Sequence, residues 1–127
     1  ALDLVERHPA PQLRPAVLWH AQAQLALQRP ALASERLQTW VTTHPQDAQA
    51  WQWLAQAWQA QNQPLRALRA QAEAQVAIRD FSAAQDRLKA AQDLARRGGN
   101  QDHIEASIID TRLRAVTELL REEARKQ

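Results

Sequence analysis

Hydrophobic positions at the spacing of a helix mark the last quarter of this 127-residue chain. Five apolar residues there share one predicted helical face: Ile104, Ile108, Leu113, Val116 and Leu120. Upstream, nearly all prolines and glycines, which interrupt helices, stand at the boundaries of segments. These breaks predict seven helices, near 1–7, 13–28, 30–43, 47–61, 64–78, 81–97 and 102–125. We therefore expect an all-α fold, in agreement with the dominance of Ala, Gln, Leu and Arg.

The sequence also repeats itself with a period of 34 residues. Shifting the chain by this amount aligns Trp19 with Trp53 and Pro30 with Pro64. This is the period of tetratricopeptide (TPR) repeats, in which two helices form a hairpin. The predicted fold is a TPR-type helical-hairpin solenoid of about seven antiparallel helices. Its parts are a remnant of a preceding repeat (1–9), a first repeat (14–47), a second repeat (48–81), an overlapping third motif (64–97) and a capping helix (102–125).

The second repeat shows the alternation of large and small residues that close helix packing needs. Trp51 and Trp58 surround the small Ala55, as at a helix crossing. Further on, Asp102 and Glu105 resemble a capping box, with Asp102 accepting a first-turn N–H and Glu105 reaching back. We expect the helix that follows to close the solenoid with an apolar inner face and a charged outer face.

Composition and spacing exclude several classes of function. The chain has no cysteine, so disulfides and Cys-ligated metal sites are absent. The formal net charge is only +2 with acids interspersed, which argues against nucleic-acid binding. No apolar run approaches the about 20 residues of a membrane span. The histidines, His8, His20, His44 and His103, are remote from one another and form no HExxH motif. We predict no enzyme activity, no metal and no cofactor in this chain.

The candidate binding site is a row of amides on the inner helices of the solenoid. Four glutamines follow each other at spacings of three, four and three, and Gln22 precedes Gln56 by one period. The predicted partner-binding residues are Gln22, Gln49, Gln52, Gln56, Gln59, Arg66, Arg69 and Glu73. Neutral amides suit a polypeptide backbone better than a terminal carboxylate, because they bring no full charge. The alternative is a solvated polar face without a ligand.

Several stretches go beyond a generic TPR pattern. They are residues 53–57, 64–73, 80–84, 88–91 and the terminal segment 102–113. Together, across about residues 14–120, they resemble the C-terminal TPR region of bacterial envelope zinc metalloproteases similar to the β-barrel assembly-enhancing protease.

In that family the HExxH domain precedes the TPR array, so the resemblance implies that zinc belongs to a catalytic domain outside this chain. It also implies a periplasmic module that docks outer-membrane β-barrel substrates or their assembly machinery. The alternative is a stand-alone TPR adaptor or scaffold with no protease attached. A signal peptide and an upstream HExxH in the full-length reading frame would discriminate between the two.

Overall fold

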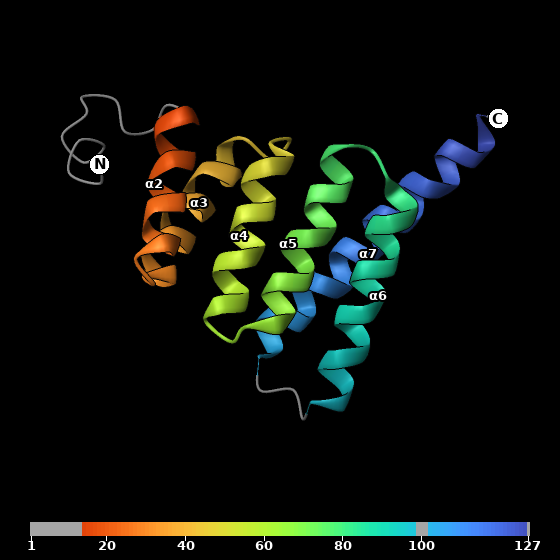
Figure 1. Cartoon of the computed structure of the whole chain (residues 1–127). Coiled ribbons are helices and arrows are strands. Elements are labelled where there is room, and N and C mark those ends of the chain that lie inside the picture. Colours follow the sequence, from red (N-terminus) through yellow and green to blue (C-terminus); the bar gives the residue numbers. More distant parts are fainter. Residues whose placement is uncertain (1–13, 99–101, 127) are drawn as a thin grey trace.

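Figure 1 shows a row of helices in which each helix runs antiparallel to the next. This computed structural model describes residues 14–98 and 102–126, which form helices and no strand. The helices are α2 (Arg14–Ala26), α3 (Pro30–Thr43), α4 (Ala48–Ala60), α5 (Pro64–Ala77), α6 (Phe81–Arg97) and α7 (His103–Arg125). The all-α prediction is confirmed. The helix predicted near 1–7 lies outside the described residues.

The helix boundaries reproduce the 34-residue period of the sequence. Helix α2 ends at Ala26 and α4 at Ala60, so the step is 60 − 26 = 34. Helix α3 runs from Pro30 to Thr43 and α5 from Pro64 to Ala77, again a step of 34 at both ends. Contacts between neighbouring hairpins also follow the period, because α2 contacts α4 as well as α3. Further along the chain this pattern shifts, since α5 contacts α7 whereas α4 makes no comparable contact with α6.

The turns that precede α3, α5 and α6 share one backbone geometry. Gln28, Asn62 and Arg79 adopt left-handed conformations, with φ of 59°, 59° and 64°. In each turn the next N–H bonds to a carbonyl five residues back, as from Gln63 N to Trp58 O at 3.0 Å. This arrangement satisfies carbonyls at the helix end in the manner of a Schellman motif. Arg79 stands 79 − 62 = 17 residues after Asn62, so the turn into α6 comes after half a period.

The helices from α3 to α7 begin either with an aspartate cap or with a proline. Asp47, Asp80 and Asp102 each accept a first-turn N–H, at 3.2, 3.1 and 3.0 Å, and so cap α4, α6 and α7. Helices α3 and α5 begin instead with Pro30 and Pro64, whose fixed φ suits the first turn. The aspartate half of the predicted capping box is therefore confirmed at the start of α7.

The core consists of two clusters that meet at α5. The first joins α2 to α5 and includes the buried Trp40, Trp51 and Trp58, with Ala55 and Ala67 at 4% and 1% exposure. The second cluster contains the buried residues Ala72, Phe81, Ala84, Leu88, Ala91, Ile109 and Val116. Small residues on α5 allow both neighbours to approach it closely. Helix α5 thus belongs to both halves of the molecule.

The predicted apolar face of the last helix is wrong in its first two turns. Ile104 and Ile108 are 77% and 37% exposed, whereas Ile109 is fully buried. The buried position in the first turn belongs to Glu105, at 2% exposure, because Arg69 of α5 pairs with it there. The predicted return of Glu105 to its own helix start is also wrong for that reason. From Val116, which is fully buried, the predicted face holds.

Candidate partner-binding surface

The structure separates the eight predicted site residues into two groups. The first group is exposed: Gln22, Gln49, Gln52, Gln56 and Gln59. On α4 these glutamines lie on the side opposite to Trp51, Leu54 and Trp58, which are buried. Gln49 Oε1 accepts a hydrogen bond from Arg14 at 3.1 Å, and the other exposed amides offer donors and acceptors to solvent. Helix α2, which carries Gln22, contacts α4.

The second group lies on α5 and pairs with α7. Arg69 Nε stands 2.5 Å from Glu105 Oε1, and both side chains are largely buried. Glu73 receives two hydrogen bonds from Arg112, at 2.6 and 2.8 Å. Two parallel bonds between a guanidinium and a carboxylate fix orientation as well as distance. These contacts hold α7 against α5.

Arg69 also lies over the ring of Trp58, with its guanidinium carbon 5.5 Å from the ring centroid. Trp58 belongs to the buried side of α4, so Arg69 reaches the side of α4 away from the glutamine row. A small pocket of about 130 Å³ is found there, between α3, α4 and α5. The structure thus does not bring the α5 residues together with the glutamines.

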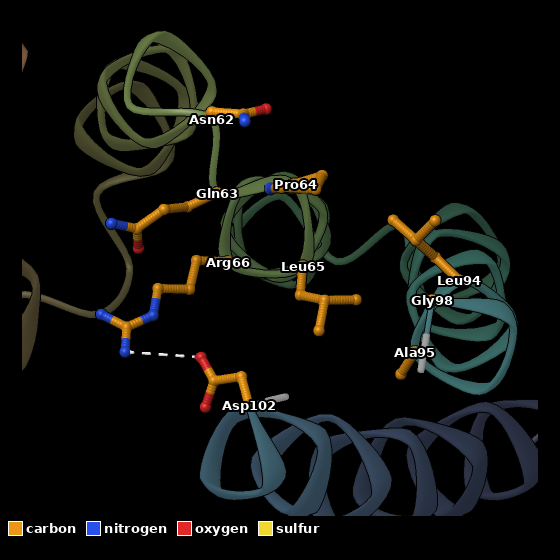
Figure 2. Close-up of a pocket in the computed structure, with 9 residues that line it drawn as sticks. All are labelled: Asn62, Gln63, Pro64, Leu65, Arg66, Leu94, Ala95, Gly98 and Asp102. Atoms are coloured by element: carbon orange, nitrogen blue, oxygen red, sulfur yellow. Dashed lines mark ion pairs between the residues drawn. The ribbon is translucent and has the colours of Figure 1, made fainter. Parts of the chain in front are cut away.

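A larger pocket, of about 370 Å³, opens where α5 begins, α6 ends and α7 begins. Figure 2 shows Leu65 and Leu94 on neighbouring helices, with Arg66 and Asp102 at one side. The two charged side chains are 3.6 Å apart and form an ion pair. Because they neutralise each other, the pocket offers apolar walls and no net charge. Sequence analysis missed this pocket, since it depends on the crossing of three helices.

A third polar cluster joins the starts of α2 and α4. Asp47 accepts hydrogen bonds from Arg14 Nε at 2.8 Å, from Trp40 Nε1 at 3.0 Å and from the Ala50 N–H at 3.2 Å. Burial by itself would raise the pKa of Asp47, but these bonds favour the carboxylate and hold its pKa below the ordinary 3.8. His44 stacks on Trp40, with ring centroids 3.6 Å apart. This cluster serves the structure by fixing a helix junction.

The described residues contain neither a candidate metal site nor a candidate membrane span. Within residues 14–98 and 102–126, no group of three or more His, Asp or Glu side chains could hold a metal ion. None of the helices described combines the length and the apolar character of a membrane span. No protein-family model matches the chain, and no curated protein gives a significant match.

Proposed function

We propose that this chain is a protein-interaction module whose exposed glutamine row receives a segment of another polypeptide. The observation that carries the proposal is the uncharged row on α4, continued one period earlier by Gln22 on α2. Each amide donates and accepts hydrogen bonds, as a peptide backbone does. A row of amides along a helix therefore matches the free N–H and C=O groups of an extended segment, or the polar side chains of a helical one.

The proposed architecture is a TPR-type solenoid, with α2 and α4 as the inner helices of two successive repeats. Three observations support it: the boundaries repeat every 34 residues, the inner helices contact each other, and Ala55 and Ala67 are buried at the small-residue places. The contact of α5 with α7, together with the turn at Arg79, supports an overlapping third motif that starts at α5.

The partner class follows from the resemblance to envelope metalloproteases. We infer that the module docks outer-membrane protein substrates, or their assembly machinery, for a zinc protease domain attached in the full-length protein. Affinity is expected to be modest, because a polar surface gains little from apolar burial and an ordered segment loses entropy. The alternative, a stand-alone adaptor, uses the same glutamine row with partners that have no connection to the envelope.

Site-specific photocrosslinking in the full-length protein tests this proposal. A benzophenone amino acid at Gln56 should capture a polypeptide partner, whereas the same probe at the exposed Arg87 on α6 should capture little. Mass spectrometry of the adduct then identifies the partner as an envelope protein or not. Crosslinks from the probe at Arg87, with none from the probe at Gln56, would show that the partner does not bind at the glutamine row. Crosslinks from Gln56 to partners outside the envelope would support the adaptor.

A further inference from the structure

Helices α2 and α4 carry the same pair of side chains at equivalent positions. Trp19 and Gln22 stand three residues apart on α2, and Trp53 and Gln56 repeat the pair 34 residues later on α4. Residues three apart are neighbours on a helix surface, so each indole lies beside an amide. Trp19 and both glutamines are exposed, and Trp53 packs in part against the first core cluster. We call each of these pairs a Trp–Gln unit.

The two Trp–Gln units lie on adjacent parallel helices. Helix α3 runs antiparallel to both α2 and α4, so these two point the same way, and Figure 1 shows them side by side. Arg14 at the start of α2 bonds to Gln49 at the start of α4 at 3.1 Å, so the helices are nearly in register. Their Cα atoms approach within 8 Å, as in directly packed helices, whose axes are about 8 to 10 Å apart. The step from one unit to the next is therefore about this distance.

The surface around the two units offers hydrogen-bond donors and little charge. Arg14 is the only Lys, Arg, Asp or Glu in α2 and α4, and it already forms an ion pair. Trp40 and Trp51 donate their indole N–H groups to acceptors within the fold, at 3.0 and 2.9 Å. The indole N–H groups of Trp19 and Trp53 have no acceptor among the described residues. The units thus combine apolar rings with N–H groups that suit carbonyl oxygens.

We propose that the two Trp–Gln units bind a proline-rich segment in the polyproline II conformation, which crosses α2 and α4. This inference rests on the proposed function and names the kind of polypeptide that the glutamine row receives. A polyproline II helix has three residues per turn and rises 3.1 Å per residue, so prolines three residues apart stand about 9 Å apart on one side. That spacing matches the step between the units, so one proline lies on Trp19 and the third residue after it lies on Trp53.

The other regular conformations of a peptide fit the two units less well. In a β-strand, successive side chains on one face are about 6.6 to 6.8 Å apart, which is shorter than the step between the units. In an α-helix the backbone carbonyls already accept hydrogen bonds within the helix. A polyproline II segment leaves its carbonyls free, and its prolines have no N–H to donate. It therefore needs donors from its partner, and the amides of Gln22 and Gln56 supply them beside the indoles.

Nuclear magnetic resonance of the indole N–H groups tests this inference on the complete chain. Decaproline is the probe, and an uncharged Gly–Ser peptide of the same length is the control, because it is flexible and has no fixed conformation. Decaproline should shift the signals of Trp19 and Trp53, which Trp19→Phe and Trp53→Phe assign. The signals of the buried Trp40, Trp51 and Trp58 should stay in place. The Gly–Ser peptide should shift none of the five.

Matched variants separate the two units from the rest of the glutamine row. Trp19→Ala should weaken decaproline binding about tenfold, because one of the two anchoring rings is lost. Gln56→Ala should weaken it about threefold, since a donor beside Trp53 is lost. Gln59→Ala, also exposed on α4 but about a third of a turn around the helix from Trp53, should leave it unchanged. Circular dichroism checks that each variant keeps its helices.

The outcomes distinguish this inference from the proposed function. No shift with decaproline, equal shifts with the Gly–Ser peptide, or unchanged affinity in Trp19→Ala would each overturn the polyproline II inference. If the probe at Gln56 then still captures a partner segment without prolines, the glutamine row stands as a binding surface and only its ligand class is rejected. If decaproline does not bind and the probe at Gln56 captures nothing, both proposals fail.

Discussion

The two halves of the molecule are held together by different means. From α2 to α4 the core is dominated by buried Trp40, Trp51 and Trp58, packed around alanines. From α5 to α7 the buried apolar residues are aliphatic apart from Phe81, and charged pairs that include the buried Glu73 and Glu105 cross between α5 and α7. The first half therefore depends mainly on apolar burial, with the Arg14–Asp47 pair at one helix junction. The second half depends in addition on largely buried ion pairs between helices.

Helix α5 takes part in both kinds of packing, the apolar cluster of the first half and the charged pairs of the second. Alanines on one side of it pack against the tryptophan cluster, while Arg69 and Glu73 face α7. A helix with neighbours on both sides needs two packing faces, and on one of them α7 adds complementary charge to the apolar contacts that α5 makes with α6. The same residues that sequence analysis assigned to a partner are thus engaged within the chain. The glutamine row remains exposed because no described helix covers it.

The largest effect is expected from Trp58→Ala in the first half. Trp58 is 3% exposed and also carries Arg69 on its ring. Removing a buried indole leaves a cavity and should lower the free energy of unfolding by about 4 kcal/mol. Urea denaturation followed by circular dichroism measures this change. Trp19→Ala is the matched control, since Trp19 is 38% exposed and its loss should cost about 1 kcal/mol or less. Equal losses at both positions would contradict the apolar account.

A smaller effect is expected from Glu105→Ala in the second half. The substitution leaves Arg69 largely buried without its carboxylate, because the Arg69 side chain is only 14% exposed. We expect a loss of about 3 kcal/mol in the free energy of unfolding. Replacing both partners, as Arg69→Leu with Glu105→Leu, should recover most of this loss, since an apolar pair leaves no buried charge unpaired.

The control for Glu105 lies on the same helix. Glu118 pairs with Arg121 at 3.6 Å, and both side chains are more than half exposed. Glu118→Ala should therefore change the free energy of unfolding by no more than about 0.5 kcal/mol. If Glu105→Ala is equally mild, α7 is held by its apolar contacts alone, and the contrast between the two halves fails.

These contrasts also show how far sequence reasoning extends. The proline and glycine breaks predicted the six described helices to within two residues, because helix boundaries are marked by local residue types. The 34-residue period is likewise readable from the sequence, since it only compares the chain with itself. The buried position of Glu105 was missed, since its partner Arg69 stands 36 residues earlier and nothing local marks the pair. Hydropathy favoured Ile104, which is exposed. The exposed glutamines followed from helical spacing, whereas the pairing of Glu73 with Arg112 depends on how α7 crosses α5.

The third prediction concerns pH and the junction at Asp47. The pKa of this carboxyl is lowered in the folded chain, so its contribution to stability is present above the ordinary value of 3.8 and is lost as pH falls through the lower folded value. Asp47→Asn keeps a capping side chain but loses the charged hydrogen bonds, at a cost of about 1 kcal/mol near pH 7. This difference from the parent chain should shrink steadily below about pH 4.

Tryptophan fluorescence reports on unfolding of the half of the molecule that contains Asp47, because all five tryptophans lie between residues 19 and 58. Parallel urea titrations of the parent chain and of Asp47→Asn at pH 7 and pH 3 give the two differences. A cost for Asp47→Asn that stays constant, or that grows towards pH 3, would show that the hydrogen bonds to Asp47 do not favour its charged form.

The smallest effect is a gain in stability at the turns. Gln28 adopts a φ of 59°, a conformation that glycine reaches without steric cost, so Gln28→Gly should raise the free energy of unfolding by about 0.5 to 1 kcal/mol. Gln22→Gly, at an exposed position in the middle of α2, should lower the free energy of unfolding by about 1 kcal/mol.

The equivalent turn in the second half should respond differently, because Arg79 both adopts a positive φ and lies over the ring of Phe81, 5.0 Å from its centroid. Arg79→Gly relieves the backbone but removes a cation–π contact worth about 0.5 to 1 kcal/mol at an exposed site, so the two terms should nearly cancel. Thermal and urea unfolding of the Gln28→Gly and Arg79→Gly variants compare the two halves directly. An equal gain in the free energy of unfolding at both turns would mean that the contact between Arg79 and Phe81 adds no stability. The dependence of the second half on charge would then be confined to the ion pairs between α5 and α7.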